Sequence, residues 1–269
     1  MSDVTGAARR ASNSDAMEWG ARAGLAARAA IYLLMGGLAL ELALGQTHRE
    51  TDQRGALTAV AQHAGGKLLL VLLAVGFAGY ALWRFSEAAF GVVGDGNGAG
   101  PRLKSLVRGL VYASFAFTTV SILAGAGGGS QAGQQQGLTA RVMGHTGGRV
   151  LIGVVGLVIV VVGATMVVEG VKKKFEKYLA MSQMSATTRS VVEKLGMVGT
   201  IARGVVIGLA GVLVVEAAVT YQPQKARGLD GALRTLARQP FGEVLLGAAA
   251  LGLIAFGIYG FAEARWHRT

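Results

Sequence analysis

Three arginines and three glutamates recur at matching places in the long apolar segments of this 269-residue sequence. They are Arg28, Arg108 and Arg203, and Glu87, Glu169 and Glu263. Charged groups inside a membrane are costly, so they are kept where they pair with one another or line a pathway for ions. Two interpretations stay open. The six residues could form an ionic ring that binds or gates an anion or a cation. Alternatively, they are structural salt bridges and snorkelling side chains that fix the register of the helices.

Two further glutamates have apolar flanks, in GLALELALG around Glu41 and in VLVVEAAVT around Glu216. Each lies 13 residues after a recurring arginine, and a helix rises about 1.5 Å per residue, so the glutamates lie about 20 Å further along. A carboxyl group there would be neutral, paired or open to a wet cavity. With His63 and His145 in the following connections it could form a proton relay. The alternative is that both carboxyl groups bond helix ends or loops, and Ser121 replaces the glutamate in the second copy.

The segments that carry these residues have the length and composition of membrane spans. The chain is 52% hydrophobic and 15% charged, and its mean hydropathy is +0.48. About 20 mostly apolar residues cross a hydrocarbon core of about 30 Å. Six blocks reach that length, at residues 25–45, 67–88, 106–125, 149–171, 198–220 and 242–262. We therefore predict an all-α integral membrane protein with six transmembrane helices, in preference to a large soluble helical core.

The sequence repeats itself three times. The segments that begin GALTAV, GLTARV and GALRTL start at Gly55, Gly137 and Gly231, and each leads into an apolar block. At the same offsets, a second glycine and the recurring glutamate align in all three copies. The predicted parts are a disordered tail at 1–20 and repeats at 21–92, 93–180 and 181–269. Each repeat holds two spans, so the copies enter the membrane in the same direction, and either a pseudo-threefold ring or a linear row would satisfy this.

This triplicated two-helix unit resembles a bacterial integral membrane family known as domain of unknown function 1206. The likeness covers about residues 20–268. The first copy departs from the pattern because SEAAFG lacks a basic residue after Glu-Ala, and the second has Gly170 after Glu169. The family has no assigned activity, so the resemblance implies an architecture and no catalytic residues.

The distribution of basic residues predicts the orientation. Of the 26 lysines and arginines, 17 fall on the side that carries both termini and nine on the other side. Basic residues concentrate on the cytoplasmic side of a membrane, so we expect both termini in the cytoplasm and the protein in the plasma membrane. The net charge of +11 then reflects topology and contact with anionic lipid, with the run Lys172–Lys174 in a helical linker as an anchor. No aromatic-interleaved basic motif points to nucleic acid.

Enzymatic chemistry finds no support in the residue pattern. The chain has no cysteine, and its histidines lack a metal-binding spacing, so we expect no catalytic residues, no cofactor and no metal. Gly204, Gly208 and Gly211 form a small-residue face for helix packing, within the monomer or in a homo-oligomer. The predicted function is a structural or accessory membrane protein. The alternative is a small-solute, ion or proton permease that uses the embedded glutamates and arginines.

Overall fold

The computed structural model describes residues 15–47, 49–91, 98–126 and 129–267, and its ordered elements there are helical. The long helices are α2 (Asp15–Ala43), α4 (Gly66–Phe90), α5 (Ala99–Leu123), α7 (Gly148–Val171), α8 (Ala186–Thr220) and α10 (Gly242–Trp266). The short ones are α3 (Gln53–Ala61), α6 (Gln131–Met143) and α9 (Gly228–Ala237), with 3₁₀ turns η1 (Lys174–Tyr178), η2 (Met181–Gln183) and η3 (Pro223–Lys225). All six long helices contain a stretch long and apolar enough to cross a membrane, which confirms the predicted all-α fold with six spans.

The first helix begins earlier than the predicted end of the N-terminal tail at residue 20. Residues 1–14 of that tail lie outside the described residues, but α2 already begins at Asp15. Residues 15–20 are therefore helical and do not belong to a disordered segment.

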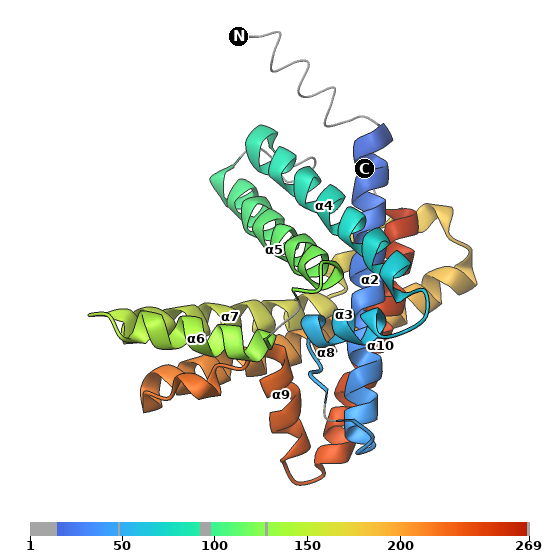
Figure 1. The fold of residues 1–269 in the computed structure, drawn as a ribbon. Coiled ribbons are helices and arrows are strands. Elements are labelled where there is room, and N and C mark those ends of the chain that lie inside the picture. Colours follow the sequence, from blue (N-terminus) through green and yellow to red (C-terminus); the bar gives the residue numbers. More distant parts are fainter. Residues whose placement is uncertain (1–14, 48, 92–97, 127–128, 268–269) are drawn as a thin grey trace, which may run out of the picture.

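Each long helix packs most extensively against a helix of a neighbouring repeat. The second helix of one repeat lies along the first helix of the next, as α4 on α5 and α7 on α8. The third repeat closes on the first, because α10 lies along α2 (Figure 1). The repeats therefore form a closed ring, and the linear row that the sequence also allowed is excluded.

The three repeats are not equivalent hairpins in space. Helices α2 and α4 of the first repeat pack against each other, and so do α8 and α10 of the third. Helices α5 and α7 of the second repeat form no comparable packed pair. The three inter-repeat pairs α2/α10, α4/α5 and α7/α8 point in different directions and meet near the middle of the molecule (Figure 1).

Glycines set the close approach of α7 and α8. A Cβ atom built on Gly163 would lie 2.5 Å from the backbone nitrogen of Gly208 and 2.7 Å from the carbonyl oxygen of Gly204. A Cβ atom on Gly211 would lie 2.6 Å from the backbone nitrogen of Val160. The predicted small-residue face of Gly204, Gly208 and Gly211 therefore packs against α7 within the chain.

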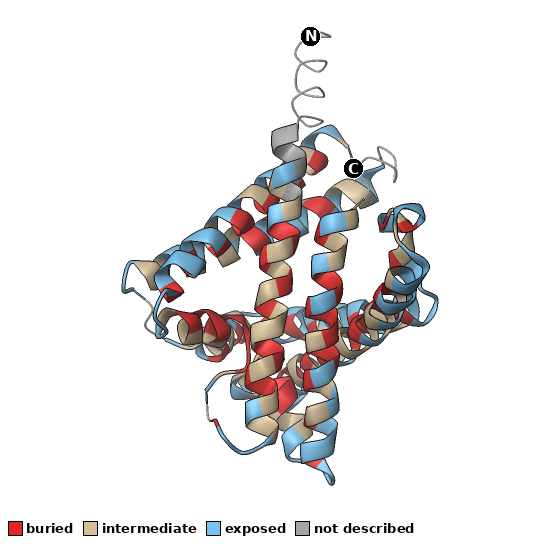
Figure 2. Ribbon diagram, turned by 90° about the vertical axis from the view of Figure 1, so that its right-hand side faces the viewer, coloured by how far each residue is buried: buried red, intermediate tan, exposed pale blue. Residues whose placement is uncertain are grey.

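Glycines also allow the close approach of α10 to α2, the contact between the third repeat and the first. A Cβ atom on Gly257 would lie 2.8 Å from the side chain of Leu33, and one on Gly260 would lie 2.9 Å from Cβ of Ala29. Further along, a Cβ atom on Gly36 would lie 2.6 Å from the side chain of Ile254. Buried residues line the two long helices where they meet, while their far ends are more exposed (Figure 2). In lipid the hydrophobic effect does not drive helices together, so close van der Waals packing along this pair stabilises their association.

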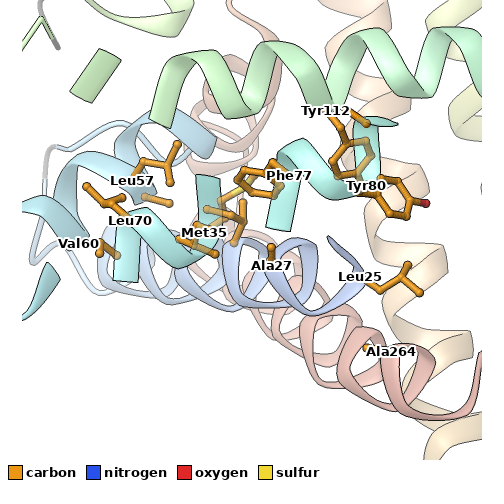
Figure 3. Close-up of a cluster of buried hydrophobic side chains, with 14 of the residues drawn as sticks. Leu25, Ala27, Met35, Leu57, Val60, Leu70, Phe77, Tyr80, Tyr112 and Ala264 are labelled. Carbon is orange, nitrogen blue, oxygen red and sulfur yellow. The ribbon is translucent and has the colours of Figure 1, made fainter. Parts of the chain in front are cut away.

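A buried cluster joins the first repeat to the second. Phe77 and Tyr80 of α4 lie beside Tyr112 of α5, together with aliphatic side chains of α2 and α3 (Figure 3). The ring centroids of Tyr80 and Tyr112 are 4.4 Å apart in an edge-on arrangement, and those of Phe77 and Phe115 are 5.8 Å apart. Such edge-to-face pairs add specific geometry to apolar burial.

The glycines that align among the repeats stand where a short helix turns into a long one. A Cβ atom on Gly66 would lie 1.8 Å from the carbonyl oxygen of Val60, so no larger residue fits there. The equivalent distances are 1.7 Å at Gly148 and 2.1 Å at Gly242. The residue before each glycine has a left-handed backbone, with φ of 79° at Gly65, 77° at Gly147 and 59° at Phe241. The recurring glycine is therefore a requirement of the turn.

The connection between α7 and α8 differs from the continuous helical linker that the sequence suggests. It consists of η1 and η2, and the apolar side chains of Phe175, Leu179 and Met181 are buried in it. The backbone nitrogen of Ala180 donates to the carbonyl oxygen of Trp266 at 2.8 Å, which ties the connection to the end of α10. The lysines at 172–174 stay exposed.

Candidate functional site

Four guanidinium groups gather where the helix pairs come together near the termini. We call this group the arginine cluster: Arg28 of α2, Arg84 of α4, Arg108 of α5 and Arg203 of α8. Three of them are the recurring arginines. Each lies within a helix that can cross a membrane, and aromatic rings surround them.

Arg28 forms the ion pair that joins the first repeat to the third. Its Nη2 donates to Oε2 of Glu263 on α10 at 2.5 Å, and both side chains are mostly buried. The guanidinium carbon also lies 5.5 Å from the ring centroid of Phe256. This pair fits the interpretation of a structural salt bridge, and it bonds residues 235 positions apart at the closure of the ring.

Glu87 bonds an arginine of its own helix and a serine of α5. Its Oε2 accepts from Nη1 of Arg84 at 2.6 Å and from the hydroxyl of Ser105 on α5 at 3.0 Å. Nη2 of Arg84 donates to the hydroxyl of Tyr80 at 2.6 Å, and the guanidinium group lies 4.2 Å from the ring centre of Trp83. Arg84 does not recur among the repeats and was not predicted as a site residue, although its (i, i+3) spacing from Glu87 was a usable signal.

Arg203 has aromatic neighbours and no carboxylate bonded to it within the described part of the chain. Its guanidinium carbon lies 5.0 Å from the ring centre of Tyr32 and 4.8 Å from that of Phe256. The Nε atom is buried and has no hydrogen-bond partner there. Ring faces attract the cation but supply no conventional hydrogen-bond acceptor, so the Nε–H is left unsatisfied.

The remaining members of the predicted set are exposed. Arg108 and Glu169 make no ion pair with any described residue, and both have exposed side chains. Given the pairing of the helices, Glu87 with Arg108 and Glu169 with Arg203 would be equivalent to Glu263 with Arg28. The structure therefore forms one of the three equivalent bonds, and the six charges do not make a regular ionic ring.

The predicted proton relay is not assembled. Glu41 and Glu216 are both exposed, and Glu216 accepts from Nζ of Lys225 at 2.6 Å, so it is paired. Nδ1 of His63 lies 2.8 Å from the carbonyl oxygen of Ala59. Nδ1 of His145 stands in the same relation to the carbonyl oxygen of Arg141, also at 2.8 Å. Each imidazole thus caps the end of its short helix, a structural use that the matching positions of the two histidines explain.

A second polar network, which was not predicted from the sequence, lies at the opposite level among the short helices. Asp230 of α9 is fully buried and accepts from the backbone nitrogen and hydroxyl of Thr51, at 3.1 and 3.2 Å. Nε of Arg234 donates to both of its oxygens, at 3.0 and 2.9 Å. Nη2 of Arg234 reaches the carbonyl oxygen of Arg49 at 2.9 Å. The third repeat is therefore bonded to the first at this level too.

The second repeat completes this outer network. The backbone nitrogen of Arg54 donates to Oε1 of Gln131 at 3.3 Å, which joins α3 to α6. The amide of Gln136 donates to the carbonyl oxygen of Gln224 at 2.9 Å, which joins α6 to η3. The sequence gives no signal for these contacts, because each bond joins residues of two different repeats.

Asp52 is the titratable group of this network whose pKa departs most clearly from its usual value. Its side chain caps α3 by accepting from the backbone nitrogen of Gly55 at 3.0 Å. Burial, with smaller contributions from the carboxylates of Glu50 and Asp230, raises the pKa of Asp52 to about 6. Within residues 15–47, 49–91, 98–126 and 129–267, no group of three histidine, aspartate or glutamate side chains could hold a metal ion.

The raised pKa predicts how an Asp52→Asn variant responds to pH. The folded protein disfavours the carboxylate form of Asp52. The contribution of Asp52 to the free energy of unfolding is therefore greatest below about pH 4 and is lost as the pH rises through about 6. Asparagine keeps the cap without the charge. We expect Asp52→Asn to unfold with a free energy about 2–3 kcal/mol higher at pH 7.5 and under about 1 kcal/mol higher at pH 4. Unfolding in detergent at the two pH values measures this, and Asp52→Ala, which lacks a cap, is the control. An equal effect of Asp52→Asn at both pH values would contradict the assignment.

Comparison with known proteins gives one consistent result. The model of the family described as Domain of Unknown Function (DUF1206) matches the chain three times, over residues 23–91, 103–173 and 198–267. A Bacillus subtilis (strain 168) relative, "Uncharacterized protein YxxB", is 32% identical over 245 residues, which cover 90% of this chain and 88% of the relative. No solved structure matches the chain. Each matched segment covers most of two of the six long helices, so the resemblance seen in the sequence is confirmed. The chain is a multi-pass membrane protein and belongs to the DUF1206 family.

Proposed function

We propose that this protein is a non-enzymatic structural or accessory component of the plasma membrane, built as a closed ring of three repeats. The observation that carries the proposal is the ion pair between Arg28 and Glu263. A recurring charge in a membrane helix is a candidate for transport by default. Here the best buried pair of the recurring set instead bonds the last repeat to the first.

The outer network supports the same function. Asp230 and Arg234 bond the third repeat to the first, and Gln131 and Gln136 bond the second repeat to both of its neighbours. Polar contacts at two levels therefore hold a ring whose helices already pack closely through glycines. Repeats that are bonded to one another in this way suit a protein that supports or accompanies other membrane components.

The alternative is a permease for small solutes, ions or protons. Its support is the arginine cluster, where Arg203 has no bonded carboxylate among the described residues. Against it, Glu216 is neutralised by Lys225, and both Glu41 and Glu216 are exposed. These carboxylates do not line a shared path with the histidines, which are used as helix caps.

Orientation is part of the proposal. The basic side chains at 172–174 are exposed in the connection between α7 and α8, on the side of the termini. An excess of basic residues on that side favours the cytoplasm, where exposed lysines would contact anionic lipid headgroups. The partners proposed are therefore the bilayer and its anionic lipids, and a second copy of the chain is compatible with the exposed helix faces.

The orientation is tested with single cysteines in a chain that has none of its own. Gln222 lies in an outer connection and Ser182 in the connection between α7 and α8, and both are exposed. In intact cells, a membrane-impermeant maleimide should label Gln222→Cys and leave Ser182→Cys unlabelled until the cells are opened. The reverse pattern would place the termini outside.

Transport is tested with the purified full chain in proteoliposomes. We expect the flux of protons, potassium, chloride and inorganic phosphate to equal that of protein-free vesicles, because the proposed role needs no pathway. An added ionophore shows that each assay can detect flux. Sustained flux of one solute that exceeds the protein-free level would overturn the structural proposal. If that flux disappears in a Glu41→Gln, Glu216→Gln double variant, those two residues belong to the pathway.

A further inference from the structure

The arginine cluster carries more positive than negative charge. Its four guanidinium groups lie with two bonded carboxylates, Glu87 and Glu263, so two positive charges are left without a negative partner in the described structure. His267 lies nearby, but burial lowers its pKa, so the imidazole is neutral near pH 7 and adds no charge. Unbalanced charge is costly at membrane depth, where water is scarce.

Arg203 is the clearest unbalanced member. Tyr32 and Phe256 hold its guanidinium group by their ring faces, at 5.0 and 4.8 Å. The two ring centroids are 4.7 Å apart and their planes are inclined by 73°, so both rings lie on the same side of the guanidinium carbon. Ring faces supply no conventional hydrogen-bond acceptor to the N–H donors of the guanidinium group. The buried Nε has no acceptor in the described structure, so at least one donor of a fixed, oriented cation is unsatisfied.

Two other arginines extend this arrangement. Arg28 lies 5.5 Å from the same Phe256 ring, and its Nε is likewise buried without an acceptor. Arg108 lies near two other cations, Arg84 and Arg28, and near the phenol of Tyr80. Arg108 is itself exposed, so the cluster opens to the surroundings of the protein on that side.

We propose that Arg203, beside the Arg28–Glu263 pair and with Arg108 at the entrance, binds a phosphate-type oxyanion. Guanidinium groups bind the oxygens of a phosphate in a bidentate, planar geometry. Two unbalanced positive charges also match the charge of one to two that a phosphate carries near neutral pH. The ring faces of Tyr32 and Phe256 hold Arg203 in place before the anion arrives, so binding orders little that is not already ordered.

Two sources supply this chemistry: the headgroup of an anionic phospholipid and free inorganic phosphate. The proposal does not depend on whether the protein is structural or a permease, since a bound headgroup suits the first and a bound solute the second. A different explanation is that the contacts with Tyr32 and Phe256 alone stabilise Arg203. That explanation predicts no specific response to phosphate.

The test uses the purified full chain in two arms. In a neutral detergent, sodium phosphate is titrated at an ionic strength held constant with sodium chloride, and the apparent Tm is followed. In lipid nanodiscs, phosphatidylcholine is replaced stepwise by phosphatidylglycerol. A ligand that binds the folded state raises the apparent Tm in proportion to its occupancy. We expect a rise with phosphate, with phosphatidylglycerol, or with both. A rise in Tm with phosphate alone indicates a free anion as the ligand. A rise with phosphatidylglycerol alone indicates a lipid headgroup.

The variants separate a site from general electrostatics. Arg203→Gln should weaken the response at least about tenfold, because a charge-assisted bidentate contact is lost. Arg265→Gln is the matched control, since Arg265 is also stacked on a ring, that of Trp266 at 5.2 Å, but is exposed at the end of α10. If Arg203→Gln does not fold, Arg203→Lys keeps the charge and should still weaken the response. A wild-type protein with no response in either arm would overturn the proposal. So would a full response in an Arg203 variant.

Discussion

The close contact between helices of consecutive repeats is the constraint on which the rest of the structure depends. In each case the second helix of one repeat lies along the first helix of the next. Glycines let the backbones approach in α7/α8 and α10/α2, whereas aromatic side chains fill the contact of α4 with α5. A single repeat leaves these faces uncovered, so the arrangement is complete when α10 has packed on α2. The closure brings residues from the two ends of the chain together, and both polar levels then assemble across it.

The two levels differ in chemistry because their neighbours differ. Near the termini, arginines lie among tyrosine, phenylalanine and tryptophan rings, and the carboxylates of Glu87 and Glu263 balance part of the charge. At the other end, backbone groups of short helices are bonded by Asp230, Gln131 and Gln136. Between the levels lie apolar and glycine contacts, which suit the middle of a bilayer. What distinguishes Arg203 is that its guanidinium group lies on two aromatic rings and bonds no carboxylate among the described residues.

Much of the fold follows from the sequence, because membrane spans and repeats leave strong periodic signals. The six long helices, the triplication and the packing face at Gly204 were all predictable. The order of packing was not, since a ring and a row place the same apolar faces in the membrane. Which arginine pairs with which glutamate was not predictable either, because the pairing depends on residues that differ between the repeats. In the first repeat, Arg84 bonds Glu87. The third repeat has Gly260 at the position equivalent to Arg84, and its Glu263 bonds Arg28 of the first repeat instead.

Closure of the ring within one chain is tested most directly by a disulfide between α2 and α10. The chain has no cysteine, and a Cβ atom on Gly260 would lie 2.9 Å from Cβ of Ala29, close to the separation that a disulfide spans after a small adjustment. Ala29→Cys with Gly260→Cys should form an intramolecular disulfide on mild oxidation in membranes. Gly37→Cys with Gly247→Cys, whose sites have no neighbour within 4 Å, should not. A disulfide that forms between two chains, or none at all, would contradict the closed ring.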